Sequence, residues 1–182
     1  KEVTEEEFVL DDIRLWREVQ PEIHRDDIMR CYSGIKLMPG AREVVKELQN
    51  RDILVAIVSS GVDLLIGSIA NMLKVDDWAA NGFEWDEEGW LIGSKPTVVQ
   101  SHDKGITVEK FARINSIDPE NIVSVGDSGP DLSMMIPGSR FIGFNPAPNR
   151  GAEDFVKAGV PIIEGQNLRN IWQPMFGEPF PE

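Results

Sequence analysis

The sequence is poor in cysteine, histidine and positive charge. Its 182 residues include one cysteine, Cys31, and two histidines, so it can form no internal disulfide and shows no zinc-site pattern. Lys and Arg number 18 against 31 Asp and Glu, and the net charge of −13 argues against broad contact with nucleic acid or anionic membrane. No apolar run is long enough to cross a bilayer. These absences favour a cytoplasmic protein that binds neither nucleic acid nor membrane.

Hydrophobic residues nevertheless make up 41% of the chain, enough for a substantial core. From residue 41 onward, helical patterns alternate with short Val- and Ile-rich runs. Such alternation predicts an α/β fold whose parallel sheet is covered by helices on both faces. Buried strands are expected at residues 53–58, 122–126, 140–144 and 160–163.

Other segments do not fit this alternation. Two helical patterns, at 4–19 and 25–32, precede it without a strand, and a hairpin is expected at 83–92. We therefore expect a partial helical cap at 1–35, an α/β core at 36–173 and a surface tail at 174–182.

The most informative segment runs from Ile122 to Asp131. A β-branched run ends there in Gly126-Asp127, and the carboxylate of Asp131 follows. Open α/β sheets bind ligands at the carboxyl ends of their strands, where a carboxylate suits a hard cation such as Mg²⁺. The alternative is that Asp127 and Ser128 only cap the next helix.

Two further groups should reach the same edge of the sheet. Ser59-Ser60-Gly61 follows a buried strand and opens a helix, so its hydroxyls and backbone N–H groups could hold a phosphate. Lys104 precedes another helix and could reach a phosphate as a point charge. The alternatives are an ordinary helix cap for the serines and a surface position for the lysine.

In this order, the motifs resemble the haloacid dehalogenase (HAD) superfamily, and within it the phosphoserine phosphatase branch. The resemblance extends over about residues 38–172 in one consistent order. The segments that carry it are Val55–Gly61, Ala80–Phe83, Asp86–Gly89, Lys104-Gly105, Gly126–Met135 and Ile142–Pro146.

The resemblance implies a HAD-type Rossmann-like sheet and an Mg²⁺-dependent phosphomonoester phosphatase. Ser59, Lys104 and Asp127 would be the catalytic residues, and Ser59, Ser60, Gly61 and Lys104 would bind the phosphate. Asp127 would ligate Mg²⁺. Asp131 would orient the site without touching the metal, or would contact the metal through water. The reaction would pass through an aspartyl-phosphate, with phosphoserine as the leading substrate.

One family element is missing. The superfamily's nucleophile stands in an Asp-x-Asp motif after a buried strand, and no segment of this sequence fits it. Asp11-Asp12 is adjacent rather than alternating, so a strand would point the two carboxylates to opposite faces. The chain begins with Lys1 rather than Met. We expect the nucleophile strand, and the rest of the cap, upstream of Lys1.

Smaller departures leave the substrate open. Pro130 stands where the branch usually has Asn, and Ser60 where it usually has Gly. Arg14 and Arg17 are candidates for reading the substrate, and Asn145 for closing the phosphate site. The alternatives are a phosphatase for another small sugar- or keto-phosphate, a catalytically inactive HAD-like binding protein and, last, a phosphorylated receiver domain.

Overall fold

The computed structural model describes residues 4–147 and 151–182. The chain divides into two compact units. Unit 1 comprises residues 1–36 and 56–100, and unit 2 comprises residues 37–55 and 101–182. The cap, core and tail boundaries expected from the sequence stay predictions, and residues 1–3 of the expected cap lie outside the described residues.

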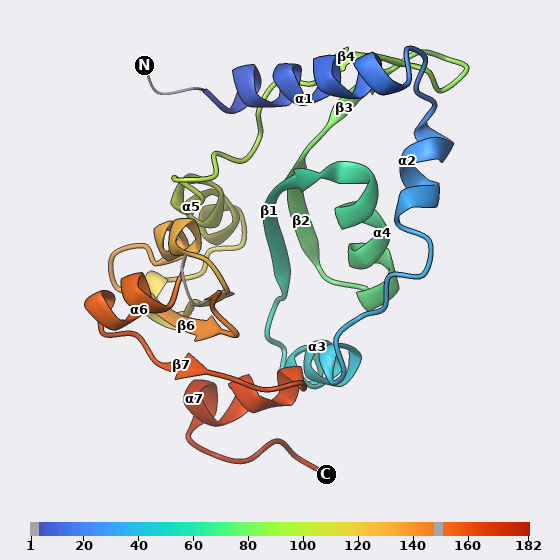
Figure 1. Cartoon of the computed structure of the whole chain (residues 1–182). Coiled ribbons are helices and arrows are strands. Elements are labelled where there is room, and N and C mark those ends of the chain that lie inside the picture. The colour runs from blue at the N-terminus through green and yellow to red at the C-terminus, as the bar shows by residue number, and fades with distance from the viewer. Residues whose placement is uncertain (1–3, 148–150) are drawn as a thin grey trace. The chain divides into compact units, whose positions relative to one another are not determined.

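Unit 1 is built around a parallel strand pair. β1 (Ala56–Val62) pairs with β2 (Asp77–Asn81), and α4 (Asp63–Leu73) connects the two and packs against both (Figure 1). The expected end of the first strand at residue 58 is wrong, because β1 continues through Ser59-Ser60-Gly61 to Val62. The continuation is irregular, since the pairing register shifts between Val58 and Val62.

A hairpin and two helices complete unit 1. The hairpin consists of β3 (Phe83–Trp85) and β4 (Leu91–Ser94), and α1 (Glu5–Val19) lies along it (Figure 1). α2 (Arg25–Cys31) follows α1 in the chain. The buried residues that hold these elements together are Ile13, Ile23, Phe83 and Leu91.

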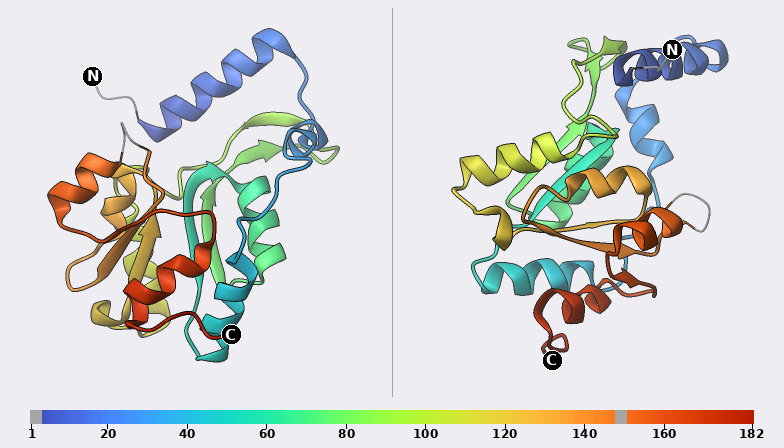
Figure 2. Two further views of the ribbon diagram at one scale, coloured as in Figure 1. Left: turned by 60° about the horizontal axis from the view of Figure 1, so that its bottom comes forward. Right: turned by 90° about the vertical axis from the view of Figure 1, so that its left-hand side faces the viewer.

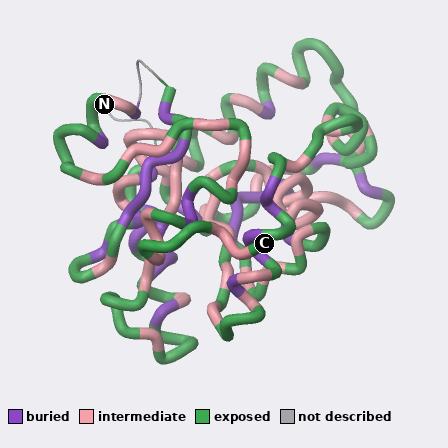
Figure 3. Tube along the Cα trace, turned by 90° about the horizontal axis from the view of Figure 1, so that it is seen from below, coloured by how far each residue is buried: buried purple, intermediate pink, exposed green. Residues whose placement is uncertain are grey.

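Unit 2 contains a three-stranded parallel sheet in the order β5 (Val123–Gly126), β6 (Arg140–Phe144), β7 (Ile162–Ile163). Four residues of β6, Phe141 to Phe144, are buried. Figure 3 marks the buried stretches of the described chain in purple. Strand side chains alternate between faces, so β6 packs on both sides. Phe144 belongs to a core shared with α3 (Ala41–Asn50) and Trp172, whereas Phe141 contacts Phe155 of α6 (Ala152–Ala158).

This sheet is therefore covered on both faces, as the alternation of helices and strands predicts. Figure 2 shows α3 and α7 on one side of it. The remaining elements of unit 2 are α5 (Gly105–Ile114), η1 (Pro119–Asn121), η2 (Gly129–Met134), η3 (Leu168–Ile171) and α7 (Trp172–Phe176).

Among the strands of residues 4–147 and 151–182, β1 pairs with β2 alone and β5 with β6 alone. A HAD-type sheet with its nucleophile strand between the segments 53–58 and 122–126 would give each of these strands a second partner. The absence of this strand from the given residues stays a prediction.

Candidate active site

The site in unit 2 forms where β5 ends and η2 begins. Gly126, the last residue of β5, makes room for Asp131, because a Cβ added at Gly126 would lie 2.4 Å from the Cβ of Asp131. Ser124, on the same face of β5, donates a hydrogen bond to the carbonyl of Met134 at 3.2 Å. The short Val/Ile-rich strand and its terminal glycine thus allow the η2 turn to fold back onto the strand end.

Asp131 is held by four donors. Its Oδ2 accepts hydrogen bonds from the backbone N–H of Asp127 and of Ser128, both at 3.0 Å, and from the Ser128 hydroxyl at 2.8 Å. Its Oδ1 accepts from the Nζ of Lys104 at 2.6 Å. The residue is 5% exposed. Both carboxylate oxygens therefore have partners, and Asp131 holds the turn and the lysine together.

The two carboxylates differ in their electrostatics. Burial favours a higher pKa for Asp131, but the hydrogen bond and charge of Lys104 and the Ser128 donors outweigh it and hold that pKa below its usual value. The pKa of Asp127 is raised, first by partial burial of the group and then by the negative charge of Asp131. A cation beside Asp127 would relieve this repulsion.

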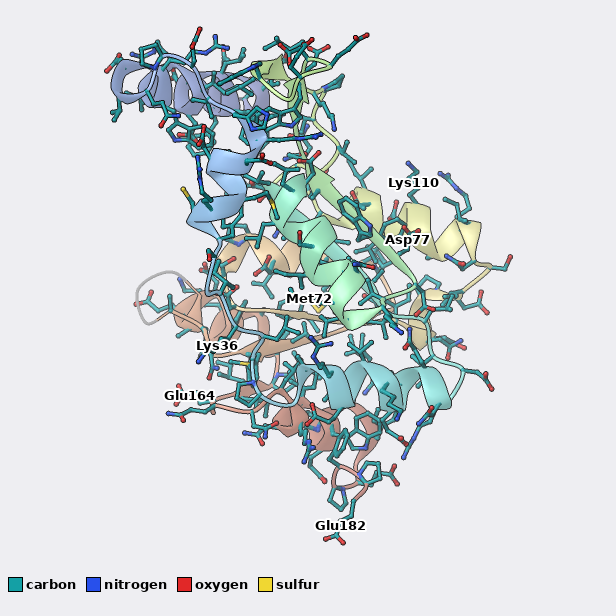
Figure 4. The ribbon with its side chains drawn as sticks, turned by 90° about the vertical axis from the view of Figure 1, so that its right-hand side faces the viewer. Lys36, Met72, Asp77, Lys110, Glu164 and Glu182 are labelled. Atoms are coloured by element: carbon teal, nitrogen blue, oxygen red, sulfur yellow. The ribbon has the colours of Figure 1, made fainter. Side chains whose placement is uncertain are left out.

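Both the backbone and the side chain of Lys104 are held by hydrogen bonds. Its backbone N–H donates to Ser133 Oγ at 2.9 Å, and Ser133 Oγ donates in turn to the Pro130 carbonyl at 2.7 Å. Lys104 is 9% exposed, so the interpretation as a surface lysine is wrong. Lys110, further along α5, is exposed and points away from the ribbon (Figure 4). Only a specific pairing, here with Asp131, accounts for burying an ammonium group.

Asp127 is the carboxylate that could hold Mg²⁺. It is exposed at the strand end, whereas both oxygens of Asp131 are occupied. In the described part of the chain, no group of three or more His, Cys, Asp or Glu residues could hold a metal ion. One carboxylate still fits Mg²⁺, which commonly keeps several waters and binds through one or two carboxylates and a substrate phosphate.

The interpretation as a helix cap is right for Ser128 and wrong for the serines at 59 and 60. Ser128 does cap η2, in a reciprocal capping box with Asp131. The serines of unit 1 do not cap α4, whose N-cap is Val62 without a side-chain hydrogen bond. Instead, Ser59 Oγ accepts a hydrogen bond from the N–H of Gly61 at 3.1 Å.

The structure brings together Lys104, Asp127 and Asp131, all in unit 2. Ser59, Ser60 and Gly61 belong to unit 1, and their convergence with the unit 2 residues stays a prediction. Sequence reasoning gave Ser128 only as a helix cap and missed Ser133, which the serine-rich Asp-Ser-Gly-Pro-Asp-Leu-Ser segment could have suggested as a local hydrogen-bonding residue.

Three candidates from the sequence have other partners. Arg17 donates to the Leu91 carbonyl at 2.7 Å and ties α1 to the hairpin. Arg14 forms exposed pairs with Asp11 and Glu18 on its own helix. The side-chain amide of Asn145 bonds to both backbone groups of Gly165, at 2.7 and 2.8 Å.

Comparison with known proteins agrees with the fold. Residues 7–135 match the haloacid dehalogenase-like hydrolase family, which is more than half of the chain. The chain belongs to this family, and its relatives place it in the phosphoserine phosphatase-like branch.

Two relatives are phosphoserine phosphatases. The phosphoserine phosphatase of Methanocaldococcus jannaschii is 37% identical over 148 residues, covering 80% of this chain and 67% of that protein. The phosphoserine phosphatase of Lactococcus lactis is 30% identical, covering 80% of this chain and 64% of that protein. This chain thus spans about two thirds of the length of these two relatives.

Solved structures agree. A substrate-bound phosphoserine phosphatase complex superposes with a TM-score of 0.74 at 27% identity, covering 94% of this chain and 80% of that one. A phospho-aspartyl intermediate analogue of phosphoserine phosphatase gives a TM-score of 0.73 at 29% identity, with the same coverage.

No described helix has both the length and the apolar character to span a membrane.

Proposed function

We propose that the complete protein is a phosphomonoester phosphatase that acts through an aspartyl-phosphate, with phosphoserine as its leading substrate. One observation carries the proposal: the buried Lys104–Asp131 pair lies at the end of β5 beside the exposed carboxylate of Asp127. The names of the relatives, and the intermediate analogue among the solved structures, support it.

The reaction has two transfers. An aspartate upstream of Lys1 attacks phosphorus, an O–P bond forms to its carboxylate, and the ester O–P bond breaks as the alcohol leaves with a proton from the second aspartate of the Asp-x-Asp motif. Water then gives a proton back to that second aspartate and attacks phosphorus, the O–P bond to the first aspartate breaks, and inorganic phosphate leaves as the carboxylate is regenerated. Both transfers need positive charge and hydrogen-bond donors around the phosphoryl oxygens.

The residues of this chain would supply those groups. Lys104 contributes a cation whose position is fixed by Asp131 and Ser133, so little reorganisation is needed when phosphate binds. Ser59 and Ser60 contribute hydroxyls, and the Ser59–Gly61 segment contributes backbone N–H groups. Asp127 would hold Mg²⁺, which neutralises phosphoryl charge when bound. Asp131 would position Lys104 and the Asp127 loop.

A small phosphorylated metabolite in the cytoplasm fits this site as partner, without nucleic acid or membrane. Substrate choice depends on residues that contact the alcohol part of the phosphomonoester. The two arginine candidates, Arg14 and Arg17, are both bonded to other protein groups here. A phosphatase for another small sugar- or keto-phosphate is therefore the second candidate. It is favoured by Pro130, which removes the polar side chain that the branch usually has at that position.

The test is a turnover assay on the protein extended upstream of Lys1 through its Asp-x-Asp motif. We expect Mg²⁺-dependent phosphate release from phosphoserine, and loss of release on chelation. Faster release from a sugar- or keto-phosphate would select the second candidate. Phosphate binding without turnover of any phosphomonoester would contradict the proposal and favour the inactive, binding HAD-like protein.

A further inference from the structure

We propose that Asn81 is a positioning residue that sets the orientation of the Ser60–Gly61 peptide in the phosphate-binding segment. The inference rests on the proposed function, since it assigns Asn81 a role toward the phosphate that Ser59–Gly61 would hold. All the contacts that carry it lie within unit 1.

The segment leaves the regular strand pairing. β1 and β2 are in register at Val58↔Ala79 and again at Val62↔Asn81. The four steps from Val58 to Val62 thus face only two steps from Ala79 to Asn81. The extra residues form a bulge at Ser59–Gly61, and a bulge leaves backbone groups without their ladder partners.

The side chain of Asn81 replaces one of those partners. Its Nδ2 donates to the Ser60 carbonyl at 3.3 Å and to the Val99 carbonyl at 2.8 Å. Its Oδ1 accepts from the N–H groups of Val98 and Val99, both at 2.9 Å. Asn81 is 6% exposed. Both amide hydrogens and both lone pairs are used, so the side chain has a single satisfied orientation.

This contact fixes the direction of a neighbouring donor. In a trans peptide, the carbonyl of Ser60 and the N–H of Gly61 point in opposite directions. Holding the carbonyl toward Asn81 therefore turns the Gly61 N–H away from it, where Ser59 Oγ now accepts it at 3.1 Å. An incoming phosphate oxygen can take the place of that hydroxyl without any rotation of the peptide.

Asn81 also holds the chain ahead of the lysine. Val99 is 0% exposed and bonds to Asn81 through both its backbone groups. Residues 100–103 connect Val99 to Lys104 in the chain. One side chain thus ties the phosphate-binding segment to the stretch that precedes Lys104 in sequence. A substitution at Asn81 should therefore affect phosphate binding as well as the stability of unit 1.

The test compares Asn81→Asp with the unsubstituted protein, both extended upstream through the Asp-x-Asp motif. Aspartate has the same shape and keeps the acceptor toward Val98 and Val99, but it replaces the donor with an oxygen facing two carbonyls. Leu91→Ala is the matched control, because Leu91 is a buried core residue of unit 1 without a side-chain bond to Ser60. Affinity for inorganic phosphate is measured by calorimetry, and KM and kcat with phosphoserine.

We expect Asn81→Asp to weaken phosphate binding and raise KM by roughly tenfold or more, which corresponds to about 1.4 kcal/mol. Leu91→Ala should leave both values near those of the unsubstituted protein at a temperature below its unfolding midpoint. Unchanged affinity and KM in Asn81→Asp, beside normal binding in the unsubstituted protein, would overturn the inference and leave the proposed function standing. Absence of phosphate binding and turnover in the unsubstituted protein would overturn both.

A second measurement needs no variant. In the unsubstituted protein, phosphate should shift the NMR signal of the Gly61 amide, while the side-chain NH₂ signals of Asn81 stay protected from hydrogen exchange with and without phosphate. A Gly61 signal that does not move at saturating phosphate, or rapid exchange of the Asn81 amide, would overturn the inference.

Discussion

The Nζ of Lys104 lies 2.6 Å from the Oδ1 of Asp131, and the two side chains are 11% and 8% exposed. A buried pair of this kind costs desolvation free energy to form, but losing one partner is worse, because an uncompensated charge stays buried. The pair therefore couples the stability of unit 2 to the position of the proposed catalytic lysine.

Asp131→Asn should lower the free energy of unfolding by about 3 kcal/mol at neutral pH. The amide keeps the size but loses the charge opposite Lys104 and one of the two acceptor oxygens, so either Lys104 or the donors of residues 127 and 128 lose their acceptor. Urea unfolding followed by tryptophan fluorescence measures the change. Asp11→Asn is the matched control, since its pair with Arg14 is exposed, and it should cost no more than about 0.5 kcal/mol. Equal effects of the two substitutions would contradict the structural role of Asp131.

Asp127→Asn should abolish Mg²⁺-dependent turnover in the complete protein, because a neutral amide is a weaker ligand for a hard cation. Unlike Asp131→Asn, it should not lower the free energy of unfolding. The pKa of Asp127 is raised by burial and by Asp131, so its charged form is disfavoured in the folded state, and removing the charge should not destabilise.

Thermal unfolding with and without Mg²⁺ checks the metal assignment apart from activity. We expect Mg²⁺ to raise the melting temperature of the unsubstituted protein and to leave that of Asp127→Asn unchanged. The same Mg²⁺-induced shift in both proteins would remove Asp127 from the metal site.

The sequence predicted the elements well where one pattern dominates. The helix at 41–50 and the strand at 140–144 agree with the structure at both ends, since their apolar spacing is regular and they are bounded by turns. The strand before α4 was misjudged, because Ser-Ser-Gly is typical of a turn, whereas here it is a bulge inside β1.

The site was predictable as residue types but not as a network. Glycine before an aspartate indicated the strand end, and a lysine before a helix was a candidate. The pairing of buried Lys104 with Asp131 and the bonds of the Asn81 amide depend on contacts between residues distant in sequence. Local patterns carry no information about such contacts.

Gly126→Ala should destabilise the protein by about 2 kcal/mol, because the added Cβ would lie 2.4 Å from the Cβ of Asp131 and force the η2 turn outward. Gly93→Ala is the matched strand control, since its Cβ would meet only Glu84 Oε2 at 3.8 Å. Urea unfolding compares the two. A Gly126→Ala protein as stable as Gly93→Ala would contradict the close packing of Asp131 on the strand end.

Acid should loosen the start of α2 through Asp27. The pKa of Asp27 is lowered, first by the hydrogen bond from the His24 N–H and also by Arg30 and Gln20. A lowered folded-state pKa means that the stabilisation is present above the unfolded value of about 3.9 and is lost as pH falls through the folded value. The His24 amide, followed by NMR, should lose its protection from hydrogen exchange as the pH falls below about 4. Asp27→Asn should lack this transition, and a transition that persists in the variant would assign it to another group.

Phe180→Ala should destabilise unit 2 by about 1–2 kcal/mol through the aromatic cluster beside α7. The ring of Phe180 lies edge-on to fully buried Trp172, with centroids 5.0 Å apart, and the guanidinium of Arg169 lies 5.0 Å from its centroid. Loss of the ring exposes one edge of Trp172 and removes the cation–π contact. Unfolding followed by tryptophan fluorescence measures the change, with Val156→Ala as control because Val156 is 69% exposed. If the Phe180→Ala protein is as stable as the control, the tail lies on the surface without stabilising unit 2, as the sequence predicted.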